Sequence, residues 1–524
     1  MKHAGKNMVV FALLLLLVTP AIFGGGATER PVTVRDDMVI ALGSDPEHLN
    51  PAITTGYPVA AVTADVYSAL VWRDNEGTPQ PDLARSWDVS AGDTVFTFHL
   101  HDNVQWHDGE PFTSADVKFS MDEVLSQYHG RFERIYGRIA SIETPNDSTV
   151  VITLNEPYAP FLISLTVFDA PILPKHIFEG QNVFDHAATT APVGTGPYRF
   201  VNWDRGNQIV LERNENYFGD AANISRVIFQ MIPDENARTV ALQTGEVDYI
   251  WGFYLPSAGL AELRADPNVE VWQGVRIPAL HFLFVNNDSE PLDNPLVRQA
   301  IMHAIDRDLI VDLAMEGLGN TAIGPMGAAF PYLYDESFDL SNLYPYDLER
   351  ARALLDEAGV GEFELTIVYD SGRPAFADAV DIMRDGLSNI GVRLNLQPQE
   401  RSVMIESVYM QRNYDLSMQS FTSGGDPSIG YHRIYITQAF GTPFVSATGY
   451  SNPEVDELLA EAAITVDLGR RGELYRQANA ILAEDLPLFP LFEEMSVEAN
   501  NRELTGLRES LDVRDKIGRA RWAD

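Results

Sequence analysis

The chain has 524 residues, of which 45% are apolar and 21% charged, so it carries enough apolar material for large hydrophobic cores. Its formal net charge of −38, from 75 acidic against 37 basic residues, repels phosphate backbones and anionic headgroups and argues against nucleic-acid binding. The lack of cysteine excludes disulfides, zinc–thiolate sites, iron–sulfur clusters and thiol catalysis.

The first residues have the pattern of a secretory signal peptide. Lys2 and Lys6 form a basic start, and the apolar run Met8–Val18 follows. This run is too short to cross a bilayer core of ~30 Å as a helix. We therefore expect residues 1–27 to be a cleaved signal peptide without a lipoprotein cysteine, and the mature protein to be periplasmic.

The residues after the signal alternate between strand-like and helix-like patterns. Alternating apolar residues predict strands over 38–43, 94–101 and 148–154, and an N-capped helix is expected over 113–128.

The second half of the chain is richer in predicted helices. Residues 295–315 are expected to form one amphipathic helix that starts near Pro295, and 346–360 a helix from an aspartate cap to a glycine stop. Further helices are expected over 376–392, 452–464 and 474–487, with strands over 363–370 and 392–399. This mixture predicts an α/β fold with at least two sheets. The lack of a Pro/Gly/Ser-rich linker indicates domains interleaved in the sequence.

The stretch PVGTGPYRF, from Pro192 to Phe200, has glycines spaced as in a phosphate-binding loop. Pro197 stands where such a loop requires a lysine, and the next residues alternate like a strand. Gly194 and Gly196 therefore predict a tight turn into a strand. Because the sequence also lacks a nucleophile elbow and a zinc-protease helix motif, we expect no enzymatic activity and no cofactor. A secreted hydrolase is the alternative of another class.

Three histidines lie close together in the sequence. His99 and His101 share one face of a predicted strand, and His107 follows. A metal site would normally add a carboxylate and supporting partners, so we expect these histidines to bind no metal.

The segment His99–Leu125, HLHDNVQWHDGEPFTSADVKFSMDEVL, resembles the signature of bacterial extracellular solute-binding proteins of family 5. These are the dipeptide-, oligopeptide- and nickel-binding components of ABC importers. Further matching segments follow the family's order: Leu49–Gly56, Leu70–Ser90, Pro192–Asp220, Ala241–Ile250, Pro291–Val311, Tyr346–Val360 and Gly449–Ala462. The resemblance covers nearly the whole mature chain.

The resemblance implies a two-lobe periplasmic-binding-protein fold of type II, with an extra subdomain inserted in the first lobe. The implied first lobe takes residues 28–73, 187–280 and 488–524, the inserted subdomain 74–186, and the second lobe 281–487. Ala279–Asn287 would form one of two segments that cross between the lobes.

In peptide-binding members of the family an aspartate holds the ligand ammonium and an arginine its carboxylate. Arg373, in YDSGRPAFAD, matches the arginine. The family stretch for the aspartate resembles Ser420–Tyr435, where Asp426 is the only acid. Asp426 is either the ammonium anchor or a turn residue before Pro427. If the anchoring acid precedes the Asp-Pro pair, Gly424 or Gly425 occupies its place and the anchor is lost.

The resemblance assigns further ligand contacts to both lobes. Expected contacts are Thr54, Thr55, Gly56 and Tyr57 in one loop, Trp251 and Phe253 in a second, and Phe421, Thr422 and Gly425 beside Asp426. Some relatives stack tryptophan and tyrosine on sugar rings, so the aromatic residues leave an oligosaccharide open as the alternative ligand.

We therefore expect an exported, non-enzymatic binding protein of an ABC importer. It would act as a monomer, bind a short peptide between its lobes, and deliver it to the transmembrane subunits of the permease.

Overall fold

The structure is a computed structural model that describes residues 36–75, 77–255, 259–510 and 517–523. The predicted signal peptide, 1–27, lies outside these residues. The residues from Asp36 to Asp524 belong to one compact unit.

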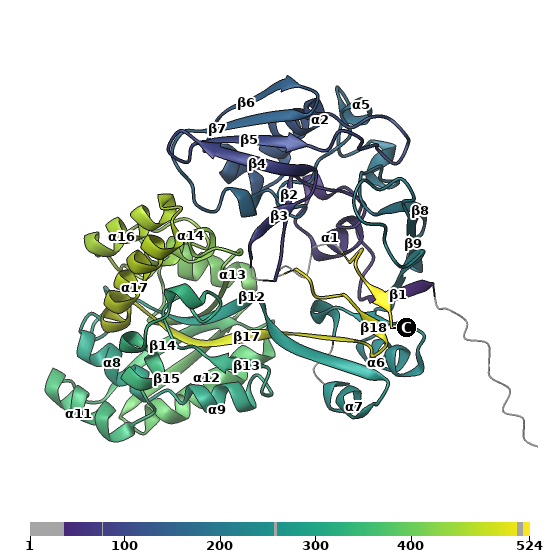
Figure 1. Cartoon of the computed structure of the whole chain (residues 1–524). Coiled ribbons are helices and arrows are strands. Elements are labelled where there is room, and N and C mark those ends of the chain that lie inside the picture. The colour runs from purple at the N-terminus through teal and green to yellow at the C-terminus, as the bar shows by residue number, and fades with distance from the viewer. Residues whose placement is uncertain (1–35, 76, 256–258, 511–516, 524) are drawn as a thin grey trace, which may run out of the picture. The chain divides into compact units, whose positions relative to one another are not determined.

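A sheet of 11 strands runs through this unit (Figure 1). Its order is β15-β14-β16-β12-β17-β11-β1-β10-β9-β8, and β13 pairs with β17 off this path. The strands are β1 (Asp37–Leu42), β8 (Tyr198–Asp204), β9 (Gln208–Arg213), β10 (Arg226–Met231), β11 (Tyr249–Ile250), β12 (Val269–Val285), β13 (Gly319–Thr321), β14 (Phe363–Asp370), β15 (Val392–Gln399), β16 (Leu416–Thr422) and β17 (Leu488–Asn501). Parallel and antiparallel neighbours both occur, so the sheet is mixed.

Two long antiparallel strands, β12 and β17, join the halves of this sheet. Their register pairs Val269 with Asn501 at one end and Phe284 with Leu488 at the other, and it shifts between Gly274 and Ala279. Near the first end β17 also pairs with β11, whereas Ala279–Val285 pairs with β16. The second part of β12 contains most of the segment that was expected to cross between lobes.

The buried apolar side chains form separate clusters in the two halves. The first cluster takes residues from Met38 to Val269 and from Ala499 to Ala520. The second and third clusters take residues between Leu280 and Phe492. Burial of apolar surface stabilises each cluster on its own, so β12 and β17 connect bodies with independent cores.

A second sheet, of four strands, has the order β4-β5-β7-β6 and packs against α2 (Ser114–Phe119). Its strands are β4 (Ala84–Ser90), β5 (Val95–Leu100), β6 (Ile139–Asn146) and β7 (Thr149–Leu154). Buried and partly exposed residues alternate along β5 and β7, as expected for strands with one face in a core. The strand pairs β2 (Val71–Arg73) with β3 (Pro79–Pro81), and β18 (Leu504–Thr505) with β19 (Arg521–Trp522), form two smaller sheets.

The helix expected over 113–128 starts where predicted but is not uniform. Thr113 and Asp116 form a capping box at its start, and a π-helical stretch, η2 (Ser120–Leu125), separates α2 from α3 (Ser126–Tyr128). The remaining helices before β12 are α1 (Tyr57–Thr63), α4 (Phe132–Tyr136), α5 (Lys175–Phe178), α6 (Glu235–Thr244) and α7 (Leu260–Ala265), with short 3₁₀ turns η1 (Pro51–Ile53), η3 (Leu162–Ser164), η4 (Ala187–Thr189) and η5 (Gly252–Tyr254).

The single helix expected over 295–315 is wrong, because two helices occupy this range. They are α8 (Pro295–His303) and α9 (Arg307–Leu313), and the Asp306 carboxylate accepts a hydrogen bond from Leu309 N at the start of α9. The apolar periodicity continues through both helices, which is why the pattern resembled one helix. The capping aspartate marks the break.

The later helices agree with the predicted positions within four residues at each end, except that the helix predicted over 474–487 begins at Leu468. Asp347 caps α11 (Leu348–Ala358), and Gly359 ends it in the left-handed conformation, as predicted. The other helices are α10 (Leu340–Leu343), α12 (Pro374–Ser388), α13 (Arg401–Ile405), α14 (Pro427–Gly430), α15 (His432–Tyr435), α16 (Pro453–Ile464) and α17 (Leu468–Asp485), with a π-helical η9 (Glu406–Met410) and 3₁₀ turns η7 (Pro331–Leu333) and η8 (Glu336–Phe338). The α/β class is confirmed.

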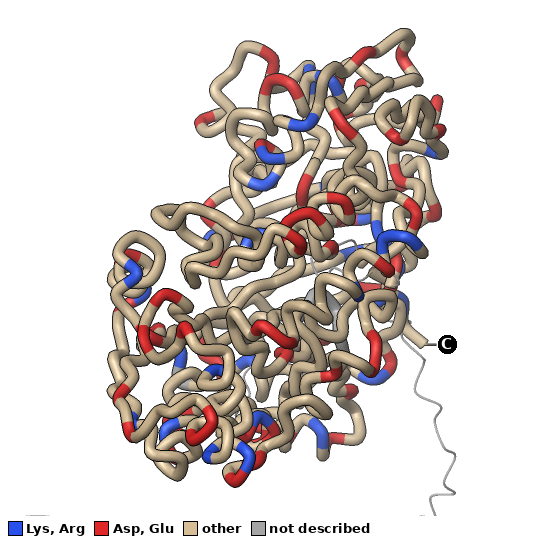
Figure 2. The backbone as a smooth tube through the Cα atoms, turned by 90° about the vertical axis from the view of Figure 1, so that its left-hand side faces the viewer, with Lys and Arg blue, Asp and Glu red and all other residues tan. Residues whose placement is uncertain are grey.

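Acidic residues are distributed along most of the backbone (Figure 2). Within the described ranges, no helix combines the length and the apolar character that a membrane crossing requires.

Candidate ligand-binding site

The loop after β16 contains the predicted anchor region. Gly424 and Gly425 have φ values of 66° and 91°, a backbone conformation that favours glycine. The Ser423 hydroxyl accepts a hydrogen bond from Gly425 N at 3.1 Å, and Asp426 then caps the short helix α14. The loop thus turns sharply twice before its one acidic residue.

The Asp426 carboxylate is engaged inside the protein. Its two oxygens accept hydrogen bonds from Nη1 and Nη2 of Arg471, each at 2.7 Å, and Oδ1 also accepts from Ser428 N at 2.9 Å. The side chains of Asp426 and Arg471 are 5% and 4% exposed. This bidentate, buried pair supports the turn interpretation of Asp426, because its acceptor positions face Arg471 and the start of α14.

The two glycines before Asp426 lie against arginines from other parts of the chain. A Cβ atom at Gly425 would overlap Nη1 of Arg73, which is on β2 and buried. A Cβ atom at Gly424 would lie 2.7 Å from Cγ2 of Ile429 and 3.7 Å from Nη2 of Arg131. An acidic side chain at either position would require its neighbours to move, and the nearby charges are positive.

Arg373 lies at another place in the same half of the molecule. It is the N-cap residue of α12, after β14, and its guanidinium lies 5.0 Å from the centre of the Phe376 ring. A hydrogen bond from His281, followed by the charges of His281 and Arg373, lowers the pKa of Glu494, although burial opposes this. Arg373 is therefore close to the crossing strands β12 and β17, which carry His281 and Glu494.

Two of the predicted contact segments meet in the structure. The ring of Tyr57, at the start of α1, stacks on the ring of Phe253 with centroids 4.5 Å apart and planes 5° apart. Just before it, the Thr54 hydroxyl accepts a hydrogen bond from Gly56 N, the N-cap position of α1, at 3.1 Å. Thr55 is exposed. The sequence alone gave no reason for the Tyr57–Phe253 pair.

The two aromatic residues of the second segment differ in exposure. Trp251 is 1% exposed and belongs to the first hydrophobic cluster, whereas Phe253 is 63% exposed. Phe253 is therefore the ring that a ligand could reach in this structure, and Trp251 packs in the core.

The remaining predicted contacts lie at the end of β16. Phe421 is buried, and its ring lies parallel to that of Phe284 with centroids 5.6 Å apart. The Arg433 guanidinium lies 5.1 Å from the centre of the Phe421 ring. Thr422 pairs with Ala279 of β12 and is exposed.

The glycines of the Pro192–Phe200 stretch allow its backbone to pack directly against the backbone of Asp65 and Val66. A Cβ atom at Gly194 or Gly196 would overlap the carbonyl oxygen of Val66 or Asp65, respectively. The His107 ring bridges the turn, accepting from Gly194 N at 3.2 Å through Nδ1 and contacting Gly196 O at 3.1 Å through Nε2. Strand β8 begins directly afterwards, so the predicted turn into a strand is confirmed.

The other two histidines have different partners. His99 contacts Asp88 at 2.9 Å, and His101 packs against Phe218 with ring centroids 5.2 Å apart. Among the described residues no group of three or more acidic, histidine or cysteine side chains could hold a metal ion. The expected lack of metal binding stays a prediction.

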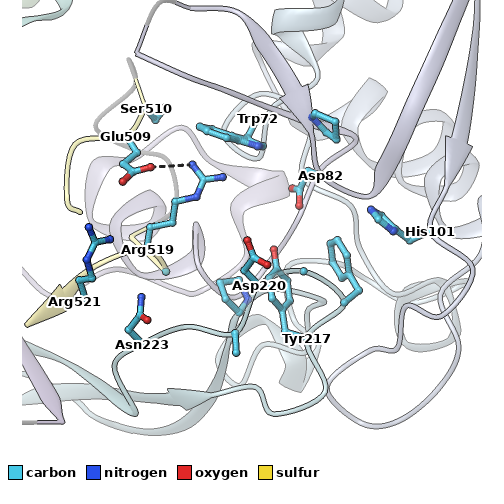
Figure 3. Close-up of a pocket in the computed structure, with 16 residues that line it drawn as sticks. Trp72, Asp82, His101, Tyr217, Asp220, Asn223, Glu509, Ser510, Arg519 and Arg521 are labelled. Carbon is cyan, nitrogen blue, oxygen red and sulfur yellow. Dashed lines mark ion pairs between the residues drawn. The ribbon is translucent and has the colours of Figure 1, made fainter. Parts of the chain in front are cut away.

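None of the predicted ligand contacts lines a hollow of about 450 Å³ in the structure (Figure 3). Trp72, His101, Tyr217 and Arg519 are among the residues that line it. The Arg519 guanidinium lies 3.8 Å from the centre of a Trp72 ring, and its Nη1 lies 3.7 Å from Oε2 of Glu509. Its walls come from the half of the molecule that contains the first hydrophobic cluster.

Sequence reasoning missed the arginines around the anchor loop. Arg73 and Arg131 approach Gly425 and Gly424 from distant parts of the chain, and Arg433, within the anchor stretch itself, packs over Phe421. The sequence offered one signal, the density of arginine between residues 131 and 138.

Comparison with known proteins agrees with this architecture. A model of the middle region of bacterial extracellular solute-binding proteins, family 5, matches residues 78–441. The glutathione-binding protein GsiB of Pectobacterium atrosepticum is 29% identical over 497 residues, covering 91% of this chain and 92% of that protein. The probable D,D-dipeptide-binding periplasmic protein DdpA of Escherichia coli is 28% identical, covering 92% and 93%. The periplasmic binding protein DppA of Helicobacter pylori, solved in complex with the peptide STSA, is 27% identical with a TM-score of 0.73, covering 94% of this chain and 99% of that one.

Proposed function

We propose, because the chain belongs to the bacterial extracellular solute-binding proteins of family 5, that it captures a short peptide between two lobes and delivers it to an ABC permease. Full-length relatives named for glutathione and dipeptide binding, and a neighbour solved with a bound peptide, support a peptide over other ligands. The protein would act in the periplasm, as a monomer and without catalysis.

The arrangement of the hydrophobic cores carries this proposal. The first cluster lies on one side of the crossing strands and the second and third clusters lie on the other, with β12 and β17 between them. We propose residues 28–73, 187–280 and 488–524 as the first lobe, 74–186 as the inserted subdomain and 281–487 as the second lobe. Bodies with separate cores can move as units about such strands, and closure around a ligand excludes water and strengthens each polar contact.

A ligand shifts this movement only through its preference for the closed state. Small-angle scattering of the ligand-free protein, titrated with a tight ligand, should therefore show a smaller radius of gyration at saturation. An unchanged radius would mean that the two lobes do not close on the ligand.

Arg373 is the proposed partner of the peptide carboxylate in the second lobe. It has a planar guanidinium suited to two parallel hydrogen bonds, and it is half-buried beside the crossing strands. Loss of one partner of a buried charge pair costs roughly 2–5 kcal/mol of binding free energy, so Arg373→Ala should weaken peptide binding by that amount. Arg384→Ala is the matched control, since Arg384 lies on the same helix in an exposed ion pair with Asp381 at 2.8 Å.

The oligosaccharide alternative has less support in the structure than in the sequence. It relied on several aromatic rings, and Trp251 is buried in a core. The Tyr57–Phe253 stack remains as one aromatic surface. Either ligand class can use such a surface, so it does not favour the sugar.

The function is tested with protein that has been unfolded and refolded to remove bound ligand. Calorimetry with a mixed tripeptide pool should give saturable heat, and mass spectrometry of the protein as purified should detect a peptide. Incubation with peptides, esters and glycosides should give no turnover. Saturable heat from cello- or xylo-oligosaccharides alone, unchanged by Arg373→Ala, would contradict the peptide proposal.

A further inference from the structure

Arg433 is a half-buried arginine whose terminal nitrogens have no protein acceptor among the described residues. It lies on α15, where Nε donates a hydrogen bond to Gly430 O at 3.1 Å and the guanidinium packs over Phe421. These contacts fix the direction of the side chain but use only one of its three nitrogens. Nη1 and Nη2 therefore remain available as a planar pair of donors.

Two further arginines reach the loop after β16 from the region that we propose as the inserted subdomain. Nη2 of Arg131 lies 3.7 Å from the position that a Cβ atom of Gly424 would take, and the positive charges of Arg131 and Arg134 both act on Arg433. Arg131 precedes α4 and Arg134 lies on it. Arg131 is paired with Asp169, whereas exposed Arg134 has no ion pair among the described side chains. The two regions touch nearby, because Ala159 N donates a hydrogen bond to Ala463 O at 3.0 Å.

The charges around Arg433 are unusual for this chain. Acidic residues outnumber basic ones by 75 to 37, yet the charged groups that most affect Arg433 are mainly arginines. Burial lowers the pKa of Arg433, the positive charges of Arg134 and Arg131 lower it further, and Tyr409 partly opposes them. Asp169, which pairs with Arg131, and Asp426, in the same loop region as Arg433, are each bound to another arginine.

This grouping of arginines is unfavourable unless an anion binds to it. Guanidinium groups at close range repel one another, and a partly buried cation without an anion loses hydration without compensation. Because Arg134 and Arg433 come from separate bodies, an anion held by both would also favour the closed arrangement of those bodies.

We infer that the ligand of this protein is an anionic peptide, with a carboxylate beyond its C-terminal one, held by Arg433 and Arg134 beside Gly424. This inference rests on the proposed function and specifies its ligand class. The carboxylate would accept from Nη1 and Nη2 of Arg433 in the planar geometry that the two groups share.

Three forms of one peptide separate charge from shape at this position. Trialanine has an amino-terminal ammonium, N-acetyl-trialanine has no charge there, and N-succinyl-trialanine carries a carboxylate. Calorimetry with refolded, ligand-free protein should give the tightest binding for the succinyl form, about tenfold or more tighter than for the acetyl form. Raising the salt concentration should weaken binding of the succinyl form more than binding of the acetyl form.

Two arginine variants test the residues. Arg433→Gln and Arg134→Gln should each weaken binding of the succinyl form by about tenfold and leave the acetyl form within about threefold. Arg134 is exposed, so its substitution should leave thermal unfolding unchanged even if Arg433→Gln does not. Arg393→Gln is the control, since Arg393 is an exposed residue of β15 that pairs with Glu364 at 3.5 Å.

The possible outcomes distinguish the inference from the proposed function. Binding of trialanine or the acetyl form as tight as that of the succinyl form, or succinyl binding unaffected by both variants, would overturn the inference and keep the peptide function. No saturable heat with any of the three forms or with the mixed tripeptide pool would count against the peptide function, and the inference would be lost with it.

Discussion

The two oxygens of Asp426 each accept a hydrogen bond from Arg471 at 2.7 Å, and both side chains are nearly inaccessible to solvent. The pair connects the loop after β16 to α17, and Asp426 also caps α14. The sequence left Asp426 open as either a ligand anchor or a turn residue, and in this structure its carboxylate is bound within the protein.

Removal of the Asp426 carboxylate should destabilise the protein. Asp426→Ala leaves the buried Arg471 guanidinium without its counter-ion, which costs about 3–5 kcal/mol of unfolding free energy. Urea unfolding measures this loss. Asp381→Ala, in an exposed pair with Arg384, should cost less than about 1 kcal/mol.

The Asp426→Ala variant also decides the role of this residue. If Asp426→Ala unfolded at the same urea concentration as the unaltered protein and yet lost ligand binding, the anchor interpretation would be correct and the framework interpretation wrong.

Trp251 and Phe253 should respond to substitution in opposite ways. Phe253→Ala removes an exposed ring that stacks on Tyr57, so ligand affinity should fall while stability changes by less than about 1 kcal/mol. Trp251→Ala leaves a cavity in the first cluster and should cost about 3–5 kcal/mol of stability. Calorimetry and urea unfolding of both variants check this. A stable Trp251→Ala protein that no longer binds ligand would contradict the assignment of Trp251 to the core.

The sequence predicted the α/β class and the positions of most elements because these depend on local patterns. Asp347 and Gly359 define the ends of α11 from within the segment itself. The break between α8 and α9 was not predicted because the apolar periodicity continues across it. Only the capping aspartate, Asp306, marks the start of α9.

The candidate site was less predictable because its key contacts join residues far apart in the sequence. Arg73 meets Gly425, Arg131 meets Gly424 and Tyr57 meets Phe253 only after the chain has folded. A sequence pattern can place an arginine on a helix, but it does not show which loop the guanidinium will reach.

The stability of the protein should fall as the pH drops from about 6.5 toward 4, partly through His107. Burial lowers the pKa of His107 to about 4, and the bond from Gly194 N to Nδ1 requires the neutral ring. The unfolded chain takes up a proton near pH 6.5, whereas the folded chain resists it until about pH 4. The stability that the neutral His107 ring contributes is therefore present in full above pH 6.5, and it is lost progressively as the pH falls toward 4.

This loss amounts to about 2 kcal/mol for His107 between pH 7 and pH 5. Urea unfolding at the two pH values measures it, and His107→Gln should reduce the difference by about that amount even though it lowers stability at both. His99→Gln, at a more exposed site, is the control. An unchanged pH dependence in His107→Gln would mean that this ring takes up its proton at the same pH in the folded and unfolded states.

The contact between Gly425 and Arg73 gives the last prediction. Gly425→Ala combines a strained backbone, at φ 91°, with an overlap between the new methyl group and the buried Arg73 guanidinium. Gly359 has a similar φ of 70°, and a Cβ atom there would meet nothing within 4 Å. Gly359→Ala should therefore cost only about 1 kcal/mol, the usual backbone penalty, and Gly425→Ala clearly more. In a double-mutant cycle, Gly425→Ala should be less damaging in an Arg73→Ala background, because the obstructing group is gone. Equal costs at the two glycines would show that the loop moves away from Arg73 freely, and that the guanidinium does not define the space beside Gly425.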